Sequence, residues 1–420
     1  MSTTSGHLPV LGPWPARMSN PIRDYDWGSP GLLARMQGRL PSGRAEAELW
    51  MGAHPASPSA LIGLDGTLQP LDLLLERHPQ SLLGSDVLAR HGARLPYLLK
   101  ILAIARPLSL QVHPDPGRSH RKFNGDGSGH YTDPFAKPEM LYALRPVDAM
   151  CGFRHTADAL DLLQRLDCPR LAPLIEGLSS TAGPQHRLEH VFALLVTWPD
   201  DDRAALVTEI ADHARRVLRA GDDAGEAGTL DPALRRTLLW VARLAAQYPR
   251  DPLVASPLLL EVVQLDPGET MFIPAGAPHA YLAGLGVEIM ANSDNVLRAG
   301  LTHKEIAVQE LLEVIDGQTR PVRDIPEVQL GPCEVAWRPA VEEFQLSRLR
   351  LPGSTPIACY PRLRGPQVLL CTNGTVGVAT PSYALALRPG ESAFVGASGG
   401  PITLAGPGEV FRAAVGEPQD

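Results

Sequence analysis

The stretch SLQVHPD, residues 109–115, carries an amide and an imidazole where the sequence otherwise predicts a buried β-strand. Alternate residues of a strand share a face, so Ser109, Gln111 and His113 point one way while their apolar neighbours point the other. A polar row inside a barrel needs partners, because an unpaired buried polar group costs on the order of 1–3 kcal/mol. A metal ion would bind the amide oxygen and the imidazole nitrogen together, whereas the alternative is an edge strand with a solvated face. These residues alone leave both interpretations open.

A second histidine lies in a recognisable pattern, in the stretch DPGETMFIPAGAPHAY. Its order, G-x5-P-x-G-x2-H ending at His279, indicates a strand, a tight turn and the start of the next strand. It resembles the second half of the two-part cupin motif, whose first half normally contains H-x-H on a strand. Gln111 and His113 stand in the H-x-H place, so the two halves occur in the expected order with Gln replacing the first His.

An acid and a base come together in the stretch HYTDPFAKPEM. Pro138 favours an extended conformation at Lys137, so Lys137 and Glu139 are predicted to project from the same face. Taken alone, the triplet Lys-Pro-Glu at residues 137–139 is more often a surface turn. Beside the other two motifs, it predicts that Glu139 is a metal ligand and Lys137 its neighbour.

A longer stretch then carries a resemblance to a known family. HAYLAGLGVEIMANSDNVLRAGLTHK, residues 279–304, is similar to the second signature of the type I phosphomannose isomerase family, except that His303 replaces a usual proline. The resemblance also includes AELWMGAHPASPS, LPYLLKILAIARPLSLQVHPD and the order of barrel, helical insertion and second barrel, so it covers nearly the whole chain. In that family one zinc ion is held by Gln, His, Glu and His, which correspond to Gln111, His113, Glu139 and His279.

The family's other signature, Y-x-D-x-N-H-K-P-E, is only partly kept. Phe135 and Ala136 replace its Asn and His, while the ligand Glu139 is retained. A proton-transfer role for a histidine beside Lys137 is therefore absent from this chain.

The resemblance implies that mannose 6-phosphate and fructose 6-phosphate are interconverted through a cis-enediol, with one Zn²⁺ per chain as electrophile or template. It also implies that Arg298 steadies the developing enediolate, because charge builds on the oxygen next to the proton being removed. The candidate bases are Asp294, Glu288 and Lys137, in no fixed order. The structural alternatives are a helix cap or Asx-turn at NSDN and a salt bridge at Arg298. The alternative functions are a non-catalytic cupin that binds sugar phosphate, and an isomerase of another phosphosugar.

The candidate phosphate-binding residues are Ser109, Lys304 and Lys100. Ser109 shares the ligand face of its strand, and Lys304 is expected near the N-terminus of a helix that begins at a capping box of Thr302 and Glu305. Lys100 interrupts an apolar run, and a satisfied core ion pair is the alternative there.

The fold class expected is mainly β, a cupin-type double jelly roll with a helical insertion domain. Residues 21–154 show the short apolar runs that are typical of strands. In residues 155–249, by contrast, the apolar residues have the spacing of amphipathic helices. After about residue 326, short alternating strands return between Gly and Pro turns. We therefore predict a catalytic barrel from residues 1–154 and 255–320, a helical insertion at 155–254 and a C-terminal jelly-roll domain at 321–420.

The composition excludes several other classes of protein. A net charge of −8 without a basic run makes nucleic acid an unsuitable partner, so an anionic small phosphosugar must find a local cluster of positive groups. Five scattered cysteines without a C-x-x-C pair argue against a disulfide framework and a cysteine zinc site. No signal-peptide core or run of about 18 apolar residues is present. We expect a cytoplasmic monomer that does not bind membranes, and the sequence leaves open whether it serves mannose use or GDP-mannose supply.

Overall fold

The computed structural model of the chain describes residues 14–125, 129–223, 230–319, 325–353, 355–359 and 365–417. The chain forms two compact units. The first comprises Met1–Ile101, Glu288–Asn292 and Ile325–Asp420, and the second comprises Leu102–Val287 and Ser293–Asp324. Two strands, β6 (Tyr97–Ile104) and β12 (His279–Ala291), contribute residues to both units.

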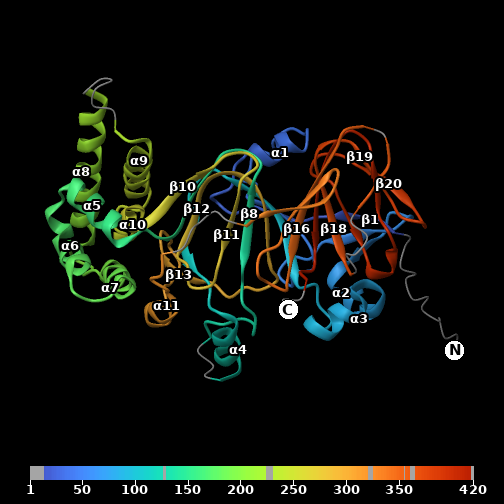
Figure 1. Cartoon of the computed structure of the whole chain (residues 1–420), viewed down its shortest axis with the longest axis horizontal. Helices are drawn as coiled ribbons and strands as arrows, with labels where there is room; N and C mark the ends of the chain where they lie inside the picture. Colours follow the sequence, from blue (N-terminus) through green and yellow to red (C-terminus); the bar gives the residue numbers. More distant parts are fainter. Residues whose placement is uncertain are drawn as a thin grey trace. The chain divides into compact units, whose positions relative to one another are not determined.

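The first unit is built mainly of antiparallel strands (Figure 1). One sheet has the strand order β14-β15-β16-β23-β18-β21-β1-β4-β5, and a smaller one has the order β17-β22-β19-β20. The strands are β1 (Ala16–Ser19), β2 (Ile22–Arg23), β3 (Glu48–Met51), β4 (Ala60–Ile62), β5 (Leu68–Pro70), β14 (Glu327–Gly331), β15 (Glu334–Trp337), β16 (Gln345–Leu351), β17 (Ile357–Ala358), β18 (Gln367–Gly374), β19 (Val376–Ala379), β20 (Ala384–Leu387), β21 (Ser392–Val395), β22 (Thr403–Ala405) and β23 (Gly408–Ala414).

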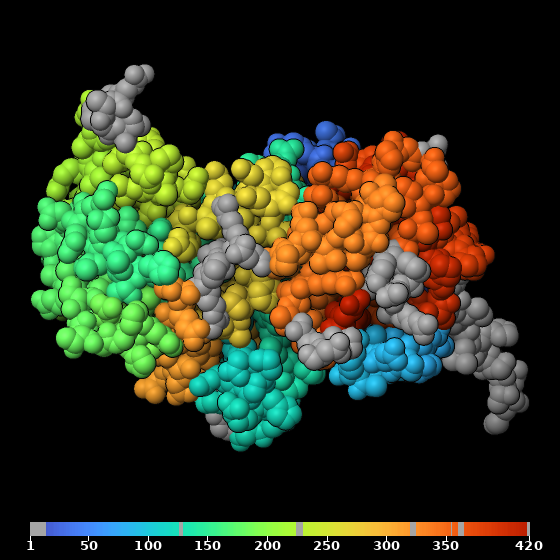
Figure 2. Space-filling view, viewed as in Figure 1, coloured from blue at the N-terminus to red at the C-terminus, as the bar shows by residue number. Residues whose placement is uncertain are grey.

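Three helices belong to the same unit: α1 (Leu32–Met36), α2 (Leu71–Arg77) and α3 (Pro79–His91). Gly84 interrupts α3 with φ near +80°, a backbone conformation that glycine adopts without steric cost. A short 3₁₀ turn, η4 (Ala397–Gly399), contacts α3. In Figure 2, α2 and α3 (light blue) lie directly beneath the orange and red C-terminal strands.

The second unit combines strands with a group of helices. Its other strands are β7 (Leu110–Val112), β8 (Glu139–Ala143), β9 (Val147–Phe153), β10 (Leu260–Leu265), β11 (Thr270–Ile273) and β13 (Leu297–Gly300). Its helices are α4 (Pro116–Gly125), α5 (Thr156–Leu166), α6 (Ala172–Ser179), α7 (Pro184–Val196), α8 (Arg203–Asp223), α9 (Pro232–Gln247), α10 (Ser256–Leu259) and α11 (Val308–Val314), with 3₁₀ turns η1 (Pro169–Leu171) and η3 (Pro252–Ala255).

The helices α5–α9 lie together at one side of this unit's strands (Figure 1). The amphipathic helices predicted for residues 155–249 are confirmed, and the longer ones are α5, α7, α8 and α9. α9 begins with Pro232 because proline suits the first helical turn, and the Asp231 carboxylate caps the helix by accepting from the N–H groups of Ala233 and Leu234.

One hydrophobic cluster joins the strands of the second unit to these helices. Leu110 and Val112, on the back of β7, are fully buried in it, and Phe153 of β9 packs edge-on against Phe192 of α7. The apolar face of β7 is therefore fixed by the helices, which leaves its opposite face to carry the polar row. This confirms the alternation predicted for residues 109–113, although β7 itself is only three residues long.

The helix predicted to begin near Thr302 begins later, at Val308. The Thr302 hydroxyl accepts from the N–H of Lys304 at 3.1 Å, so a local turn has replaced the capping box. The prediction that places Lys304 at a helix N-terminus was wrong, because Lys304 lies in an exposed bend before the helix.

No helix among the described residues is long and apolar enough to cross a membrane. The three-domain division proposed from the sequence stays a prediction.

Candidate metal centre and active site

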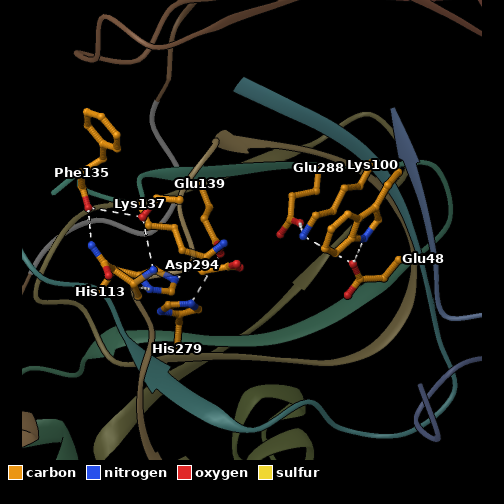
Figure 3. Close-up of polar contacts among 12 residues, drawn as sticks. Glu48, Lys100, His113, Phe135, Lys137, Glu139, His279, Glu288 and Asp294 are labelled. Carbon is orange, nitrogen blue, oxygen red and sulfur yellow. Dashed lines mark hydrogen bonds and ion pairs between the residues drawn. The ribbon is translucent and has the colours of Figure 1, made fainter. Parts of the chain in front are cut away.

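Three side chains from separate strands converge in the second unit. His113 follows β7, Glu139 begins β8 and His279 begins β12. Their ligand atoms all lie within 4.8 Å of one another, and the three residues are at most 3% exposed. Figure 3 shows the two imidazoles and the carboxylate pointing toward one another.

Backbone carbonyls set the tautomer of both imidazoles. Nδ1 of His113 lies 3.1 Å from the carbonyl oxygen of Asn295, and Nδ1 of His279 lies 3.0 Å from that of Ala277. A carbonyl oxygen can only accept, so each Nδ1 carries the hydrogen and each Nε2 presents a lone pair.

The two Nε2 atoms face Glu139 at 3.3 and 3.6 Å. Within the described part of the chain, neither Nε2 makes a hydrogen bond, and neither does Oε2 of Glu139. Buried acceptors that face one another are unfavourable unless a cation lies among them. The residues present therefore fit a divalent metal, and N and O ligands of this kind suit zinc.

The charges at the site keep these ligands in the forms that a metal needs. Burial lowers the pKa of His113 to about 4 in spite of the nearby Glu139, so its imidazole is neutral at physiological pH. Burial raises the pKa of Glu139, but Lys137, His113 and His279 together hold it well below its usual range. Lys137 lies 3.1 Å from Oε1 of Glu139, which confirms that the two side chains project from one face.

Gln111 lies beside the three converging residues by strand register. In β7 it pairs with His279 of β12 and with Arg298 of β13. Its half-buried side chain forms no hydrogen bond with any described residue. An unpaired amide oxygen next to three ligands is suited to complete a four-ligand site.

Arg298 occupies the neighbouring position on β13 and is half-buried. Within the described ranges, its guanidinium takes part in no hydrogen bond or ion pair, so the structural salt bridge considered from the sequence is not found. A cation without a protein partner beside a metal site is available to an anionic group of a ligand.

Asn295, a residue that the sequence did not identify as functional, holds this region together. The Asn295 side chain accepts from the N–H of Thr132 at 2.8 Å and donates to the carbonyl oxygens of Asp133 and Phe135 at 2.7 and 2.8 Å. The Ser293 hydroxyl donates to the Asp133 carboxylate at 2.9 Å. Since the Asn295 carbonyl also orients His113, we call Ser293, Asn295 and Asp133 the clasp. The polar stretch NSDN drew attention to this loop. The role of Asn295 could not be predicted, because its partners lie about 160 positions earlier in the sequence.

The two residues that depart from the family signature are placed by the same clasp. The N–H of Phe135 donates to the Asp133 carboxylate at 2.9 Å, and its carbonyl accepts from Asn295. Ala136 is buried. The backbone leading to Lys137 and Glu139 is therefore held without the usual Asn and His side chains.

Asp294 differs from its neighbours in the clasp because it is exposed. Its N–H donates to the Asp133 carboxylate at 3.0 Å, which fixes the backbone and leaves the carboxyl at the surface of the unit. Ser109 is half-buried at the start of the polar row, while Lys304 is exposed.

Lys100 and Glu288 lie in the first unit, in an ion-pair group of their own (Figure 3). The Lys100 ammonium lies 3.4 Å from Glu48 and 3.2 Å from Glu288, and 5.1 Å from the centre of the Trp50 ring. The indole N–H of Trp50 donates to Glu48. All four are buried, so Lys100 forms the satisfied core ion pair considered as its alternative.

Antiparallel barrel strands with an inward His, Glu and His set define a metal-binding cupin, the fold class expected from the sequence. Residues 16–156 match the model of the phosphomannose isomerase type I catalytic domain. Mannose-6-phosphate isomerase of Escherichia coli K12 is 34% identical over 410 residues, which span 94% of this chain and 98% of that protein. Mannose-6-phosphate isomerase 1 of Arabidopsis thaliana is 31% identical over 90% of this chain and 88% of its own.

Solved structures of phosphomannose isomerases also match this chain. A phosphomannose isomerase mutant from Salmonella typhimurium matches with a TM-score of 0.83 and 31% identity, covering 96% of this chain and all of that one. A zinc-bound mannose 6-phosphate isomerase matches with a TM-score of 0.82 and 32% identity, covering 96% and 99%. The chain belongs to the type I phosphomannose isomerase family.

Proposed function

We propose that this protein is an enzyme that interconverts mannose 6-phosphate and fructose 6-phosphate. The observation that carries the proposal is the convergence of His113, Glu139 and His279, whose facing atoms lack hydrogen bonds, in a chain of this family. The reaction moves a proton between C2 and C1 of the sugar through a cis-enediol. Its cofactor is one zinc ion per chain.

Gln111, His113, Glu139 and His279 hold the zinc in this proposal. When bound, the ion supplies positive charge that favours negative charge on the sugar oxygens. The clasp keeps His113 in the ligating tautomer, and the carbonyl of Ala277 does the same for His279.

Arg298 stabilises the enediolate. Its guanidinium lies on the strand next to Gln111 and has no ion-pair partner among the described residues, so its charge is available when the substrate becomes anionic. Arg298→Ala should lower kcat strongly and leave the zinc content unchanged, whereas Arg215→Ala, at an exposed position of α8, should change neither. Retained turnover in Arg298→Ala would remove this role.

Three residues are candidates for moving the proton. Lys137 is paired with Glu139, Asp294 is exposed in the clasp loop, and Glu288 is buried beside Lys100. We would compare Lys137→Met, Asp294→Asn and Glu288→Gln for kcat and for uptake of solvent deuterium at the transferred position. The base is the residue whose loss stops both while zinc stays bound, and a candidate whose variant retains both is excluded.

Ser109 and Lys304 bind the phosphate. Ser109 starts the polar row that includes Gln111, and Lys304 is exposed without an ion-pair partner among the described residues. Lys100 is better placed to pair with Glu48 and Glu288 than to meet a phosphate, because these two buried carboxylates already contact it. Lys304→Ala should raise KM for the sugar phosphate, and an unchanged KM would exclude Lys304.

The experiment that tests the function is a coupled assay for fructose 6-phosphate formed from mannose 6-phosphate. The purified protein is assayed as prepared, after chelation, and after zinc is restored. Turnover that disappears with the metal and returns with it is the expected result. No turnover from fully zinc-loaded protein would contradict the proposal and would point to a binding protein or another phosphosugar, with Phe135 and Ala136 the first positions to revert.

The protein acts as a cytoplasmic monomer in this proposal and needs no nucleic acid or membrane. Its five cysteines are free, as suits a reducing compartment. Light scattering of the eluting protein should give the mass of one 45.1 kDa chain. A larger mass would exclude the monomer.

A further inference from the structure

The C-terminal strands of the first unit enclose a cavity of about 510 Å³ that the proposed reaction does not use. A cavity of this size is within the range of roughly 300–1,000 Å³ that small ligands occupy. It is bounded by the second half of α3, by the glycine-rich segments around η4 and Gly416, and by the strands β16, β18 and β23. In Figure 2, α3 (light blue) lies beside the orange and red surface formed by the C-terminal part of the chain.

The strand register shows that polar side chains share the inner face of this barrel. Arg412 of β23 lies opposite Ser347 of β16, and Gln345 and Gln367 both lie opposite Ala414 of β23. Residues opposite one another in a sheet point to the same side. All four polar residues are buried, and Arg412, Gln345 and Gln367 line the cavity.

Arg412 is the polar centre of this face. It is 1% exposed, donates from Nη2 to the buried Glu334, and donates from Nη1 to Gln367 at 3.4 Å. Its Nε–H has no hydrogen-bond partner among the residues that the structure describes, although an orphaned buried donor is costly. The charge of this arginine is balanced by Glu334, and the Nε–H remains as an unused donor on a residue that lines the cavity.

The rim of the cavity carries charges of both signs. Asp86 and Glu417 are exposed there, and the half-buried Arg90 donates to the carbonyl of Gly416 at 3.2 Å. Glu334 already balances Arg412, and Glu417 pairs with Arg338 at 3.1 Å, which leaves Asp86 and Arg90 as lining charges of opposite sign. The cavity therefore has no net preference for an anion. Carboxylates accept from hydroxyl groups and arginines donate to them, so a molecule rich in hydroxyls satisfies both kinds of group.

The lining thiol argues against covalent chemistry. Burial raises the pKa of Cys359 to about 12, which keeps the sulfur protonated and unreactive at neutral pH.

From the unpartnered Arg412 Nε–H in a cavity of balanced charge, we propose that the C-terminal barrel holds a second, non-catalytic binding site for a small neutral polyhydroxylated molecule such as a monosaccharide or polyol. The ligand's hydroxyls accept from Arg412 at the floor and donate to Asp86 and Glu417 at the rim. This site is separate from the proposed reaction and does not depend on zinc.

The test uses the full-length protein and calorimetric titration with D-glucose, D-glucitol and myo-inositol, each up to tens of millimolar. The decisive variant is Arg412→Met combined with Glu334→Leu, since replacing both members of a buried ion pair by apolar residues of similar volume is commonly tolerated. The matched control is Arg350→Met combined with Glu409→Leu, which removes an ion pair of 2.9 Å between β16 and β23, where Arg350 is exposed and Glu409 is half-buried. Isomerase turnover and thermal unfolding confirm that each variant is folded.

We expect at least one of these compounds to bind the parent and the control with a millimolar dissociation constant, and to lose at least tenfold in affinity with the Arg412 and Glu334 double variant. Ser85→Trp, at an exposed lining position, should block the same binding without changing the floor. Absence of binding by all three compounds would overturn the proposal. So would binding that the double variant leaves unchanged, or binding of D-glucose 6-phosphate in the cavity in preference to D-glucose.

Discussion

The metal centre and the C-terminal cavity both place polar side chains on the inner face of a barrel, but they leave different groups unpaired. At the metal centre, two Nε2 atoms and a carboxylate oxygen face one another and form no hydrogen bond with any described residue. In the C-terminal barrel, Arg412 is neutralised by Glu334, and one N–H donor remains.

This difference determines which ligand each barrel accepts. Several lone pairs directed at one point attract a cation, whereas a single donor beside a closed ion pair attracts a neutral acceptor. The residue types alone do not show this, since both rows contain Gln and a charged partner. The atoms that remain unpaired separate the two sites.

The largest effect is expected from the loss of a metal ligand. His279→Ala should abolish zinc binding and lower kcat by about 1,000-fold, because the metal contributes several kcal/mol to stabilising charge in the transition state. Turnover is measured by the coupled assay and zinc by elemental analysis. His186→Ala, exposed on α7, should keep both. A His279→Ala protein that retained zinc would contradict the ligand assignment.

The closed ion pair predicts a large stability effect in the other barrel. Arg412→Met alone should lower the free energy of unfolding by about 3 kcal/mol, because Glu334 is left buried without its arginine partner. The double change with Glu334→Leu should restore most of that loss. Urea denaturation of the parent, the single variant and the double variant measures the free energy of unfolding. Equal stabilities of the single and double variants would show that Arg412 and Glu334 are not coupled.

The clasp should have an intermediate effect on the metal centre. Asn295→Ala removes the side chain that holds Asp133 and Phe135, and with it the placement of the carbonyl that orients His113. Loss of such an orienting partner typically costs about 10–100-fold in metal affinity or activity. Zinc affinity by competition with a chelator gives the readout, with Asn124→Ala on the exposed surface of α4 as the control. Unchanged zinc affinity and turnover would show that the clasp does not position the metal ligands.

The smallest effect should come from Ser347→Ala. The Ser347 hydroxyl is fully buried on the inner face of β16 and has no hydrogen-bond partner in the ranges that the structure describes. Deleting an unsatisfied polar group should leave stability unchanged or raise it by about 1 kcal/mol. Thermal unfolding of the variant measures this, and a clear loss of stability would show that the hydroxyl has a partner, which would narrow the contrast between the two barrels.

Features of the site and fold that depend on local geometry were predicted from the sequence. Alternation along a strand was enough to place Gln111 and His113 on one face, and the proline at 138 was enough to set Lys137 beside Glu139. Periodicity identified the longer helices of the insertion because their apolar faces pack on one core.

Features that depend on distant partners were not predicted. The clasp joins residues about 160 positions apart, and the role of Asn295 appears only once the two segments are brought together. Lys100 was assigned to phosphate because its carboxylate partners, Glu48 and Glu288, lie far away in the sequence. The capping box failed for a local reason, since the Thr302 hydroxyl bonds two residues ahead instead of three.

The backbone carbonyls that orient His113 and His279 have a further consequence for the encounter with substrate. Carbonyls fix the tautomer without adding charge, so with one carboxylate and neutral Gln and His ligands, the zinc-loaded centre keeps about one positive charge beside Lys137. The chain as a whole carries −8. A sugar phosphate therefore approaches a positive spot in a negative molecule, and rising ionic strength should slow capture by screening that attraction within about 10 Å at 0.1 M salt.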